Sequence, residues 1–223
     1  MSLPPLAYIA FSSIVLPFVL SVFTWRRFRD DTWPLIVLYG AYSEVLVIQY
    51  TLAIRRINNL WSSHLYNVLE LVLVLLMYRM WISSKEMKNA FAGAAAAYLV
   101  FWVTAMTFLE SFDGPGSFTS VISRVLLVAG SLFVLFEITS AENDRSLIAE
   151  SKFWFAAGFL VGSAGDLMFY AFDSFIAGFS FEYAMKVASF HWSVTLVSNI
   201  LVIIGILCKP RLRISGGHLE LAR

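Results

Sequence analysis

Nine ionisable and amide residues stand inside otherwise apolar stretches of this chain, and their chemistry is the best guide to a function. They are Glu44, Gln49, His64, Asn67, Glu70, Arg124, Asp166, His191 and Asn199. Carboxylate and imidazole groups exchange protons, and together with guanidinium and amide groups they form ion pairs or hydrogen bonds with polar ligands. Inside a membrane such groups are costly, so they face the protein interior and mark functional sites.

Composition indicates an integral, multi-pass membrane protein. The chain has 223 residues, of which 59% are hydrophobic and only 14% charged, and its mean hydropathy is +0.76. Soluble domains carry about 25% charged residues. The net charge of +1 gives no reason to expect nucleic-acid binding.

Seven apolar runs are long enough to cross a bilayer, which takes about 20 residues per helix. We expect helices over residues 6–24, 33–53, 64–81, 90–109, 118–138, 153–172 and 184–207. No spacer between them is long enough for a soluble domain. The sequence therefore predicts an all-α fold, with a single seven-helix transmembrane domain over residues 1–223 that ends in a short basic tail, 208–223.

The distribution of lysine and arginine predicts the orientation. With alternating helices, eleven of these residues fall on one side, whereas the other side has only Arg55, Arg56 and Lys186. Basic residues concentrate on the cytoplasmic side of membrane proteins. We therefore expect the N-terminus outside, the C-terminus in the cytoplasm, and a bacterial inner membrane as the location.

Depth along the expected helices places most of the polar residues in one layer. Glu70, Arg124 and Asp166 each lie six residues from an outer helix end, or about 9 Å at the α-helical rise. His191 and Gln49 are expected at a similar depth. We predict an outward-facing ligand-binding pocket made of Glu70, Arg124, Asp166, His191, Asn67, Gln49 and, on a deeper turn, Asn199.

Helical spacing groups these residues into stripes, because residues three or four apart share a helix face. One stripe holds His64, Asn67 and Glu70. A second holds His191, Thr195, Ser198 and Asn199, and a third holds Tyr39, Tyr42, Ser43, Gln49 and Tyr50. Each stripe predicts a helix face turned towards the bundle interior.

Gly158, Gly162, Asp166 and Tyr170 recur every four residues on the expected sixth helix. Small residues at this spacing let a neighbouring helix approach closely, so we interpret Gly158 and Gly162 as packing residues. Asp166 on the same ridge must find a partner or hold a proton.

Several residues keep more than one interpretation. Glu70 and Arg124 fit a structural ion pair as well as a functional one. His191 could titrate near neutral pH or simply satisfy hydrogen bonds. We expect His64 to be a solvated histidine at the membrane boundary. Glu44 falls on the opposite side of its helix, where it would pair with another helix or mark an oligomer contact.

A metal centre or bound cofactor is not expected. A zinc hydrolase site uses three nitrogen or carboxylate ligands, and the chain has only His64, His191 and His218, with no His-x-x-x-His pair. Lys186 lies too near a helix edge for a retinal-type Schiff base.

Three segments carry a resemblance to an uncharacterised group of small bacterial seven-helix inner-membrane proteins. They are residues 58–70 (from Asn58–Asn59–Leu60–Trp61 to Glu70), Lys152–Phe153–Trp154, and the stretch from His191–Trp192 to Asn199–Ile200. The resemblance implies the seven-helix layout and an outward polar pocket. It implies no activity.

Two functions fit these features. The first is a receptor-like sensor that binds a small ligand or a proton from outside and signals to a separate cytoplasmic partner, since too few residues follow the last helix for a fused output domain. The second is a small proton-coupled transporter. The clear internal repeats and broken helices of many transporters are not evident, which favours the sensor. An intramembrane hydrolase is a distant third. The sequence does not predict an oligomeric state.

Overall fold

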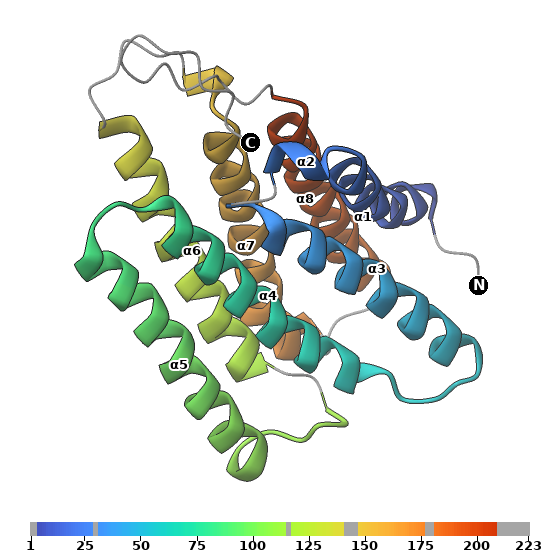
Figure 1. The fold of residues 1–223 in the computed structure, drawn as a ribbon. Coiled ribbons are helices and arrows are strands. Elements are labelled where there is room, and N and C mark those ends of the chain that lie inside the picture. The colour runs from blue at the N-terminus through green and yellow to red at the C-terminus, as the bar shows by residue number, and fades with distance from the viewer. Residues whose placement is uncertain (1–3, 29–30, 115–116, 141–146, 177–180, 209–223) are drawn as a thin grey trace, which may run out of the picture.

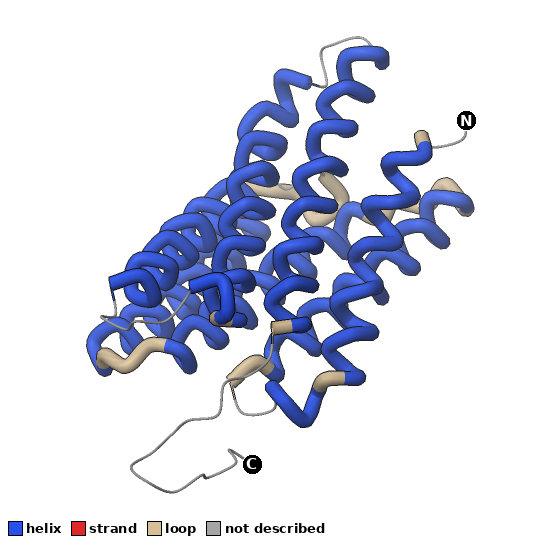
Figure 2. The backbone as a smooth tube through the Cα atoms, turned by 90° about the horizontal axis from the view of Figure 1, so that it is seen from above, coloured by secondary structure: helices blue, strands red, loops and turns tan. Residues whose placement is uncertain are grey.

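The computed structural model describes residues 4–28, 31–114, 117–140, 147–176 and 181–208. These residues form helices and loops without any strand (Figure 2). Seven of the helices are long and apolar enough to cross a membrane. They are α1 (Pro5–Phe23), α3 (Trp33–Ile54), α4 (Leu60–Trp81), α5 (Lys85–Phe108), α6 (Ser117–Ser140), α7 (Ser151–Ile176) and α8 (Phe181–Leu207). The prediction of seven long apolar helices is confirmed.

Several helices begin earlier than their apolar runs. Helix α4 begins at Leu60, four residues before the expected start, and α5 begins at Lys85, five residues before it. In α5 the Ser84 side chain accepts a hydrogen bond from the backbone N–H of Met87, which caps the helix. Polar residues can form the first turn of a helix, but they lower the local hydropathy. The length of an apolar run therefore underestimates the length of the helix that contains it.

Six long helices form a closed ring in which each packs against two neighbours. The cyclic order is α1, α3, α4, α6, α7 and α8, and α8 packs back against α1. Helix α5 lies outside this ring, against α4 and α6 (Figure 1). Two short elements, α2 (Trp25–Phe28) and the 3-10 helix η1 (Leu147–Ala149), connect ring helices.

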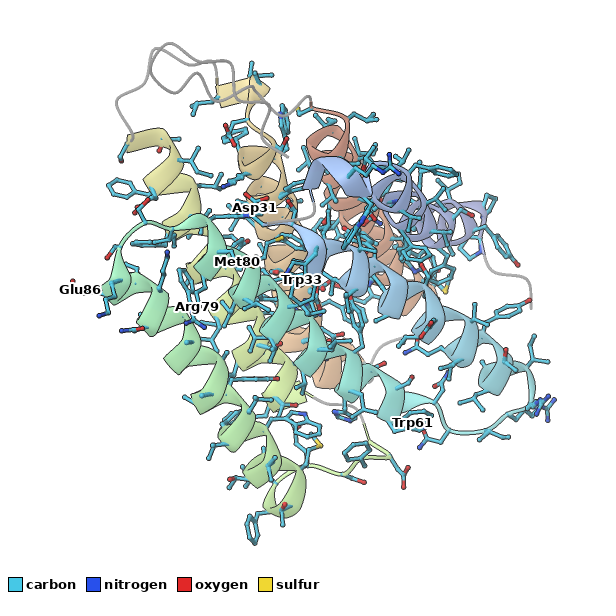
Figure 3. All side chains as sticks on the ribbon, viewed as in Figure 1. Asp31, Trp33, Trp61, Arg79, Met80 and Glu86 are labelled. Atoms are coloured by element: carbon cyan, nitrogen blue, oxygen red, sulfur yellow. The ribbon has the colours of Figure 1, made fainter. Side chains whose placement is uncertain are left out.

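One end of the bundle, here called the basic end, carries Arg26, Arg79, Lys85, Lys88 and Lys152. Figure 3 shows Asp31, Arg79 and Glu86 towards this end and Trp61 towards the opposite one.

Lys152 Nζ lies 3.0 Å from Asp31 Oδ2 and above the Trp81 ring. The Trp81 indole N–H donates to the Asp31 carbonyl, 3.0 Å away. These contacts tie the start of α7 to the segment just before α3 and to the last residue of α4. The predicted basic tail lies outside the described residues except for Cys208.

Glu110 caps the start of α6 at the opposite end. Its carboxylate accepts hydrogen bonds from the backbone N–H groups of Phe118 and Thr119 and from the Thr119 hydroxyl. A negative charge at a helix N-terminus satisfies free N–H groups and complements the helix dipole.

We expect Glu110→Ala to lower the free energy of unfolding by about 0.5–2 kcal/mol, measured by SDS titration in mixed micelles. Asp113→Ala in the same loop is the control and should change stability by less than about 0.5 kcal/mol; equal effects would contradict the cap.

Candidate functional site

Arg124 of α6 is the centre of a buried ionic cluster. Its side chain is 4% exposed. Its Nη1 atom lies 2.6 Å from Glu70 Oε2 on α4, and its Nη2 atom lies 3.3 Å from Asp166 Oδ2 on α7. One guanidinium thus bridges two carboxylates from two different helices.

An amide and an aromatic ring hold the Arg124 guanidinium in place. Asn67 Oδ1 accepts a hydrogen bond from Arg124 Nη2 at 3.0 Å, and Asn67 Nδ2 donates to Ser120 Oγ at 2.8 Å. The Tyr170 ring centre lies 5.9 Å from the guanidinium carbon, within the range of a cation–π contact. The orientation of Arg124 is therefore set by α4, α6 and α7 together.

His191 of α8 extends the cluster to a fourth helix. Its Nδ1 atom lies 3.2 Å from Asp166 Oδ1, and its ring lies 4.9 Å from the Phe169 ring. The His191 side chain is 26% exposed, the most accessible of the four cluster residues, compared with 18% for Asp166 and 13% for Glu70. His191 thus links the ionic cluster to α8 through Asp166.

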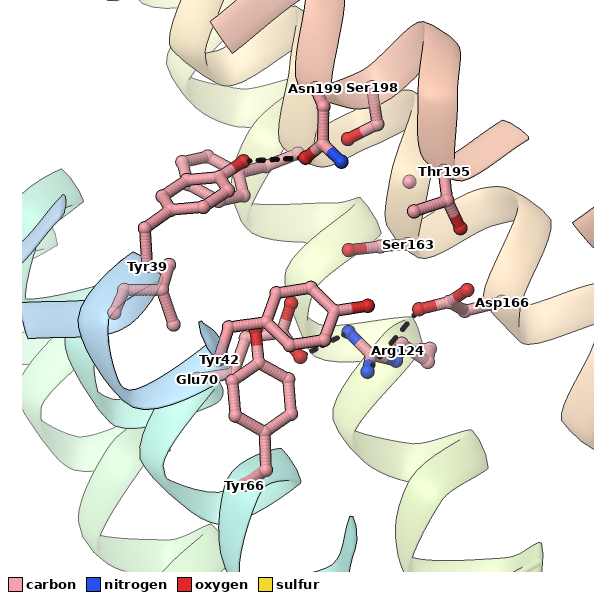
Figure 4. A pocket seen from close by; sticks show the side chains of 13 residues that line it. Tyr39, Tyr42, Tyr66, Glu70, Arg124, Ser163, Asp166, Thr195, Ser198 and Asn199 are labelled. Atoms are coloured by element: carbon pink, nitrogen blue, oxygen red, sulfur yellow. Dashed lines mark hydrogen bonds and ion pairs between the residues drawn. The ribbon is translucent and has the colours of Figure 1, made fainter. Parts of the chain in front are cut away.

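A small cavity lies beside this cluster, inside the helix ring. The space open to the centres of water-sized spheres is about 50 Å³. One water needs roughly 10–15 Å³ by this measure, so the cavity has room for a few waters or one small ligand. Its lining residues come from α3, α4, α6, α7 and α8, and their polar side chains point towards one another in Figure 4. The lining residues are Leu38, Tyr39, Tyr42, Tyr66, Glu70, Arg124, Phe159, Gly162, Ser163, Asp166, Thr195, Ser198 and Asn199.

Polar contacts continue from the cavity towards the basic end. The Tyr39 hydroxyl donates to Asn199 Oδ1 at 3.1 Å, and Asn199 Nδ2 donates to Ser13 Oγ of α1 at 2.9 Å. Asn199 lies eight residues after His191 on α8, or about 12 Å along the helix axis. The polar interior thus extends over about two helical turns.

Hydrogen bonding within the cluster is incomplete. Arg124 Nε is buried and has no hydrogen-bond partner among the described residues. Glu70 Oε2 lies close to Arg124 Nη1, and His191 Nδ1 lies close to Asp166 Oδ1, but neither contact has the geometry of a hydrogen bond. Buried polar groups are nearly always paired, so the cluster retains capacity to bind a proton, water or a small polar ligand.

The cluster also has an uneven charge. Arg124 contributes one positive charge, whereas Glu70 and Asp166 contribute two negative charges when both are ionised. A net charge in a water-poor interior is unfavourable. One additional proton, on either carboxylate or on His191, makes the four residues neutral.

The structure brings together most of the predicted pocket residues. Glu70, Arg124 and Asp166 line the cavity, as does Asn199 on a deeper turn. Asn67 and His191 contact the charged groups directly. Glu70, Arg124, Asp166 and His191 therefore meet although they lie on four different helices.

Gln49 is not part of this arrangement. Its Nε2 atom donates to Ser63 Oγ at 2.7 Å, and its backbone carbonyl accepts from Asn59 Nδ2 at 3.0 Å. It therefore joins α3 to the start of α4 instead of lining the cavity. The early start of α4 provides these nearby polar partners, which is why the depth argument was wrong for this residue.

The expectation of a solvated His64 is wrong. His64 is 2% exposed, its Nε2 atom lies 2.9 Å from the Gly114 carbonyl oxygen, and its ring faces Phe112. The loop before α6 covers it, because α4 begins four residues earlier and carries His64 inside the bundle. The outward orientation of Glu44 is as expected, since its side chain is exposed.

The cluster lies deeper in the bundle than predicted. Glu70 is ten residues from the start of α4, and His191 is ten residues from the start of α8. These positions are about 15 Å from the helix ends instead of the expected 9 Å. The polar first turns that lengthen the helices move the cluster towards mid-bundle.

The glycine ridge of α7 faces α8. A Cβ atom on Gly158 would lie 2.9 Å from Val202 Cγ2 and 3.1 Å from the Ser198 carbonyl oxygen. One on Gly162 would lie 2.8 Å from Ser198 Oγ. Ser198 Oγ also donates to the Gly158 carbonyl at 2.9 Å. The absence of side chains at these positions lets α7 and α8 approach closely beside Asp166.

The pocket predicted from the sequence did not include Ser163 and Tyr66, which both line the cavity. Ser163 precedes Asp166 by three residues and so shares its helix face, which could have identified it. Tyr66 stacks on Tyr42 with ring centres 4.5 Å apart. That contact joins α3 to α4 and depends on the helix arrangement.

Among the residues that the structure describes, no three His, Cys, Asp or Glu side chains are grouped as metal ligands. No protein-family model matches the chain, and no curated protein or solved structure matches it significantly. The resemblance to small seven-helix proteins therefore stays a prediction.

Proposed function

We propose that this chain is a multi-pass membrane sensor in which protonation of the cluster formed by Glu70, Arg124, Asp166 and His191 shifts α7 and α8. The observation that carries the proposal is that one guanidinium faces two buried carboxylates and a histidine beside a cavity with room for a few waters. A proton that enters from the end opposite the basic end neutralises the cluster. The output is expected to reach a separate cytoplasmic protein.

The size of the cavity favours a proton, water or a very small ligand. Pockets for drug-sized ligands have volumes of about 300–1,000 Å³, far above the space of about 50 Å³ found beside the cluster. A histidine is the side chain whose charge ordinarily changes between pH 5 and 8. His191 contacts the Asp166 carboxylate and is the most accessible residue of the cluster.

His191 contacts the cluster through one carboxylate, Asp166 of α7. Arg124 of α6 contacts that same carboxylate, the Tyr170 ring of α7 and Glu70 of α4. Helix α1 contains no ionisable side chain except Tyr8 near its start. Protonated His191 attracts Asp166 more strongly and weakens the hold of Arg124 on that carboxylate. Because Asp166 lies on α7, the exchange biases the position of α7 against α6 and α8.

Apolar packing between the cavity and the basic end favours sensing over translocation. Leu35, Phe155, Val202 and Ile206 are each at most 2% exposed on the basic-end half of α3, α7 and α8. Phe155 stacks on Trp81, which lies beneath the pair of Lys152 and Asp31. These apolar side chains lie between the cavity and the basic end, which favours binding of a proton without its transfer across the bundle.

Cys208, the single cysteine, provides a reporter for the test. It follows α8, and its thiol lies 3.7 Å from the Ile148 carbonyl, to which the Trp154 indole also donates. Burial and the nearby Glu150 carboxylate raise the pKa of the Cys208 thiol, so labelling is done at mildly alkaline pH. With bimane on Cys208, we expect quenching by Trp154 to change as the outer pH falls from about 8 to 5 in proteoliposomes.

Substitutions identify the group that responds. We expect His191→Gln and Asp166→Asn each to remove the pH-dependent change, whereas His64→Gln, which removes a buried histidine outside the cavity, should retain it. An unchanged response in both cluster variants would overturn the proposal. A signalling partner is then sought by crosslinking from the cytoplasmic side at each pH.

A proton-coupled transporter is the second candidate, favoured by the polar contacts that continue from the cavity through Tyr39, Asn199 and Ser13. Proteoliposomes with a pH-sensitive dye inside separate the two functions. A sensor gives no proton or solute flux above protein-free vesicles. Flux that Asp166→Asn abolishes would show transport and would contradict the sensor.

A further inference from the structure

Glu44 is an ionisable residue at the middle of a helix and on its outer surface. It lies eleven residues after Trp33 and ten before Ile54, the two ends of α3. Its side chain is exposed, and it makes no hydrogen bond or ion pair with any described residue. The cavity and its ionic cluster lie on the opposite side of α3, which presents Tyr39 and Tyr42 to them.

The surface around Glu44 is mainly aliphatic, and the exposed Thr51 on the same face uses its hydroxyl to donate to the Val47 carbonyl. Val37, Val47, Ile48 and Ile54 are between 38% and 66% exposed on the same helix. When α3 spans a bilayer, this face meets lipid tails at the depth where a carboxylate is most costly. A carboxylate in this position is expected to have a hydrogen-bond donor or a cation from another helix.

The chain itself offers no accessible cation at that depth. Within the described candidate spans, Arg124 is the one lysine or arginine that lies more than a turn from a span end. It is buried and engaged by Glu70 and Asp166. A second copy of the described fold therefore cannot supply the complementary charge to Glu44, whereas a different membrane protein can.

We propose that the outer face of α3 around Glu44, formed with Val37, Val47, Ile48 and Ile54, binds a transmembrane helix of another membrane protein that carries an arginine or lysine at mid-membrane depth. The opposite charges meet where solvent is absent, and the flanking aliphatic side chains pack against the partner helix. This docking surface is independent of the proposed proton sensing.

A defined peptide tests this surface. The probe is a leucine-rich transmembrane peptide with one central arginine and a fluorescent acceptor, reconstituted in zwitterionic vesicles with the full chain labelled by a donor at Cys208. We expect energy transfer to show roughly threefold to tenfold tighter association than for the peptide with leucine in place of arginine. In Glu44→Leu this preference for the arginine peptide should disappear.

A second variant keeps the carboxylate and moves it to another exposed face. Ala97 is exposed at the middle of α5, twelve residues after Lys85, so Glu44→Leu/Ala97→Glu should not restore the preference. Restored binding would show that any exposed carboxylate suffices and would overturn the α3 surface. The absence of any preference in the wild-type chain would also overturn it, as would Glu44-dependent energy transfer between two labelled copies of the chain. Circular dichroism should show unchanged helix content in both variants.

Discussion

Arg124→Gln is expected to lower the free energy of unfolding by about 3–5 kcal/mol, the cost of breaking a buried ion pair. The substitution leaves Glu70 and Asp166 without the guanidinium that bridges them. It also removes the donor to Asn67 Oδ1. SDS titration in mixed micelles, followed by circular dichroism, measures the change.

Removal of all three charges should recover most of this loss. In Glu70→Gln/Arg124→Gln/Asp166→Asn no unpaired charge remains, and replacing a complete buried ion pair is often nearly neutral. Arg79→Gln is the matched control, because Arg79 is exposed near the end of α4, and it should change stability by less than about 0.5 kcal/mol. A triple variant as unstable as Arg124→Gln would show that the loss of stability comes from the packing of the Arg124 side chain and not from unpaired charges.

Gly158→Leu is expected to lower the free energy of unfolding by about 3 kcal/mol, the upper part of the range for overpacking. A Cβ atom added at this position would lie 3.1 Å from the backbone carbonyl oxygen of Ser198, which cannot move without displacing α8. The forced separation of α7 and α8 also pulls Asp166 away from His191. The same SDS titration measures the stability, and the pH response of bimane on Cys208 should be lost with it.

Gly93 provides the matched control on α5. A Cβ atom on Gly93 has no neighbour within 4 Å, so Gly93→Leu adds a side chain on an open helix surface. We expect no loss of stability and a gain of up to about 1 kcal/mol from helix propensity. Equal losses at Gly93 and Gly158 would contradict the close packing of α7 against α8.

Helical geometry explains why the ionic cluster was predictable. Glu70, Arg124 and Asp166 each had to avoid lipid, and a charge in a membrane has few stable positions other than opposite a complementary charge. Their similar depth made mutual contact the simplest solution. His191 followed from the same depth, and its contact with Asp166 completes the cluster.

The wrong predictions concern residues near helix ends. The surroundings of Gln49 and His64 both depend on the residue at which α4 begins. A hydropathy profile does not detect the first turn of α4. Once α4 starts at Leu60, His64 lies inside the bundle against Gly114, and Gln49 finds Ser63. The burial and the hydrogen-bond partners of such residues depend on contacts between segments far apart in the chain, which no local sequence pattern predicts.

The sequence by itself determined the class of protein, the seven long apolar helices, the polar residues that must be buried together and the outward face of Glu44. These features follow from composition and from the period of the helix, which are local properties. Only the tertiary structure decided that Arg124 bridges two carboxylates, that Asn67 orients it, and that a cavity with room for a few waters lies beside them. Those features depend on the order of the helices in the ring and on the distances between their axes, which arise from side-chain packing between segments far apart in the chain.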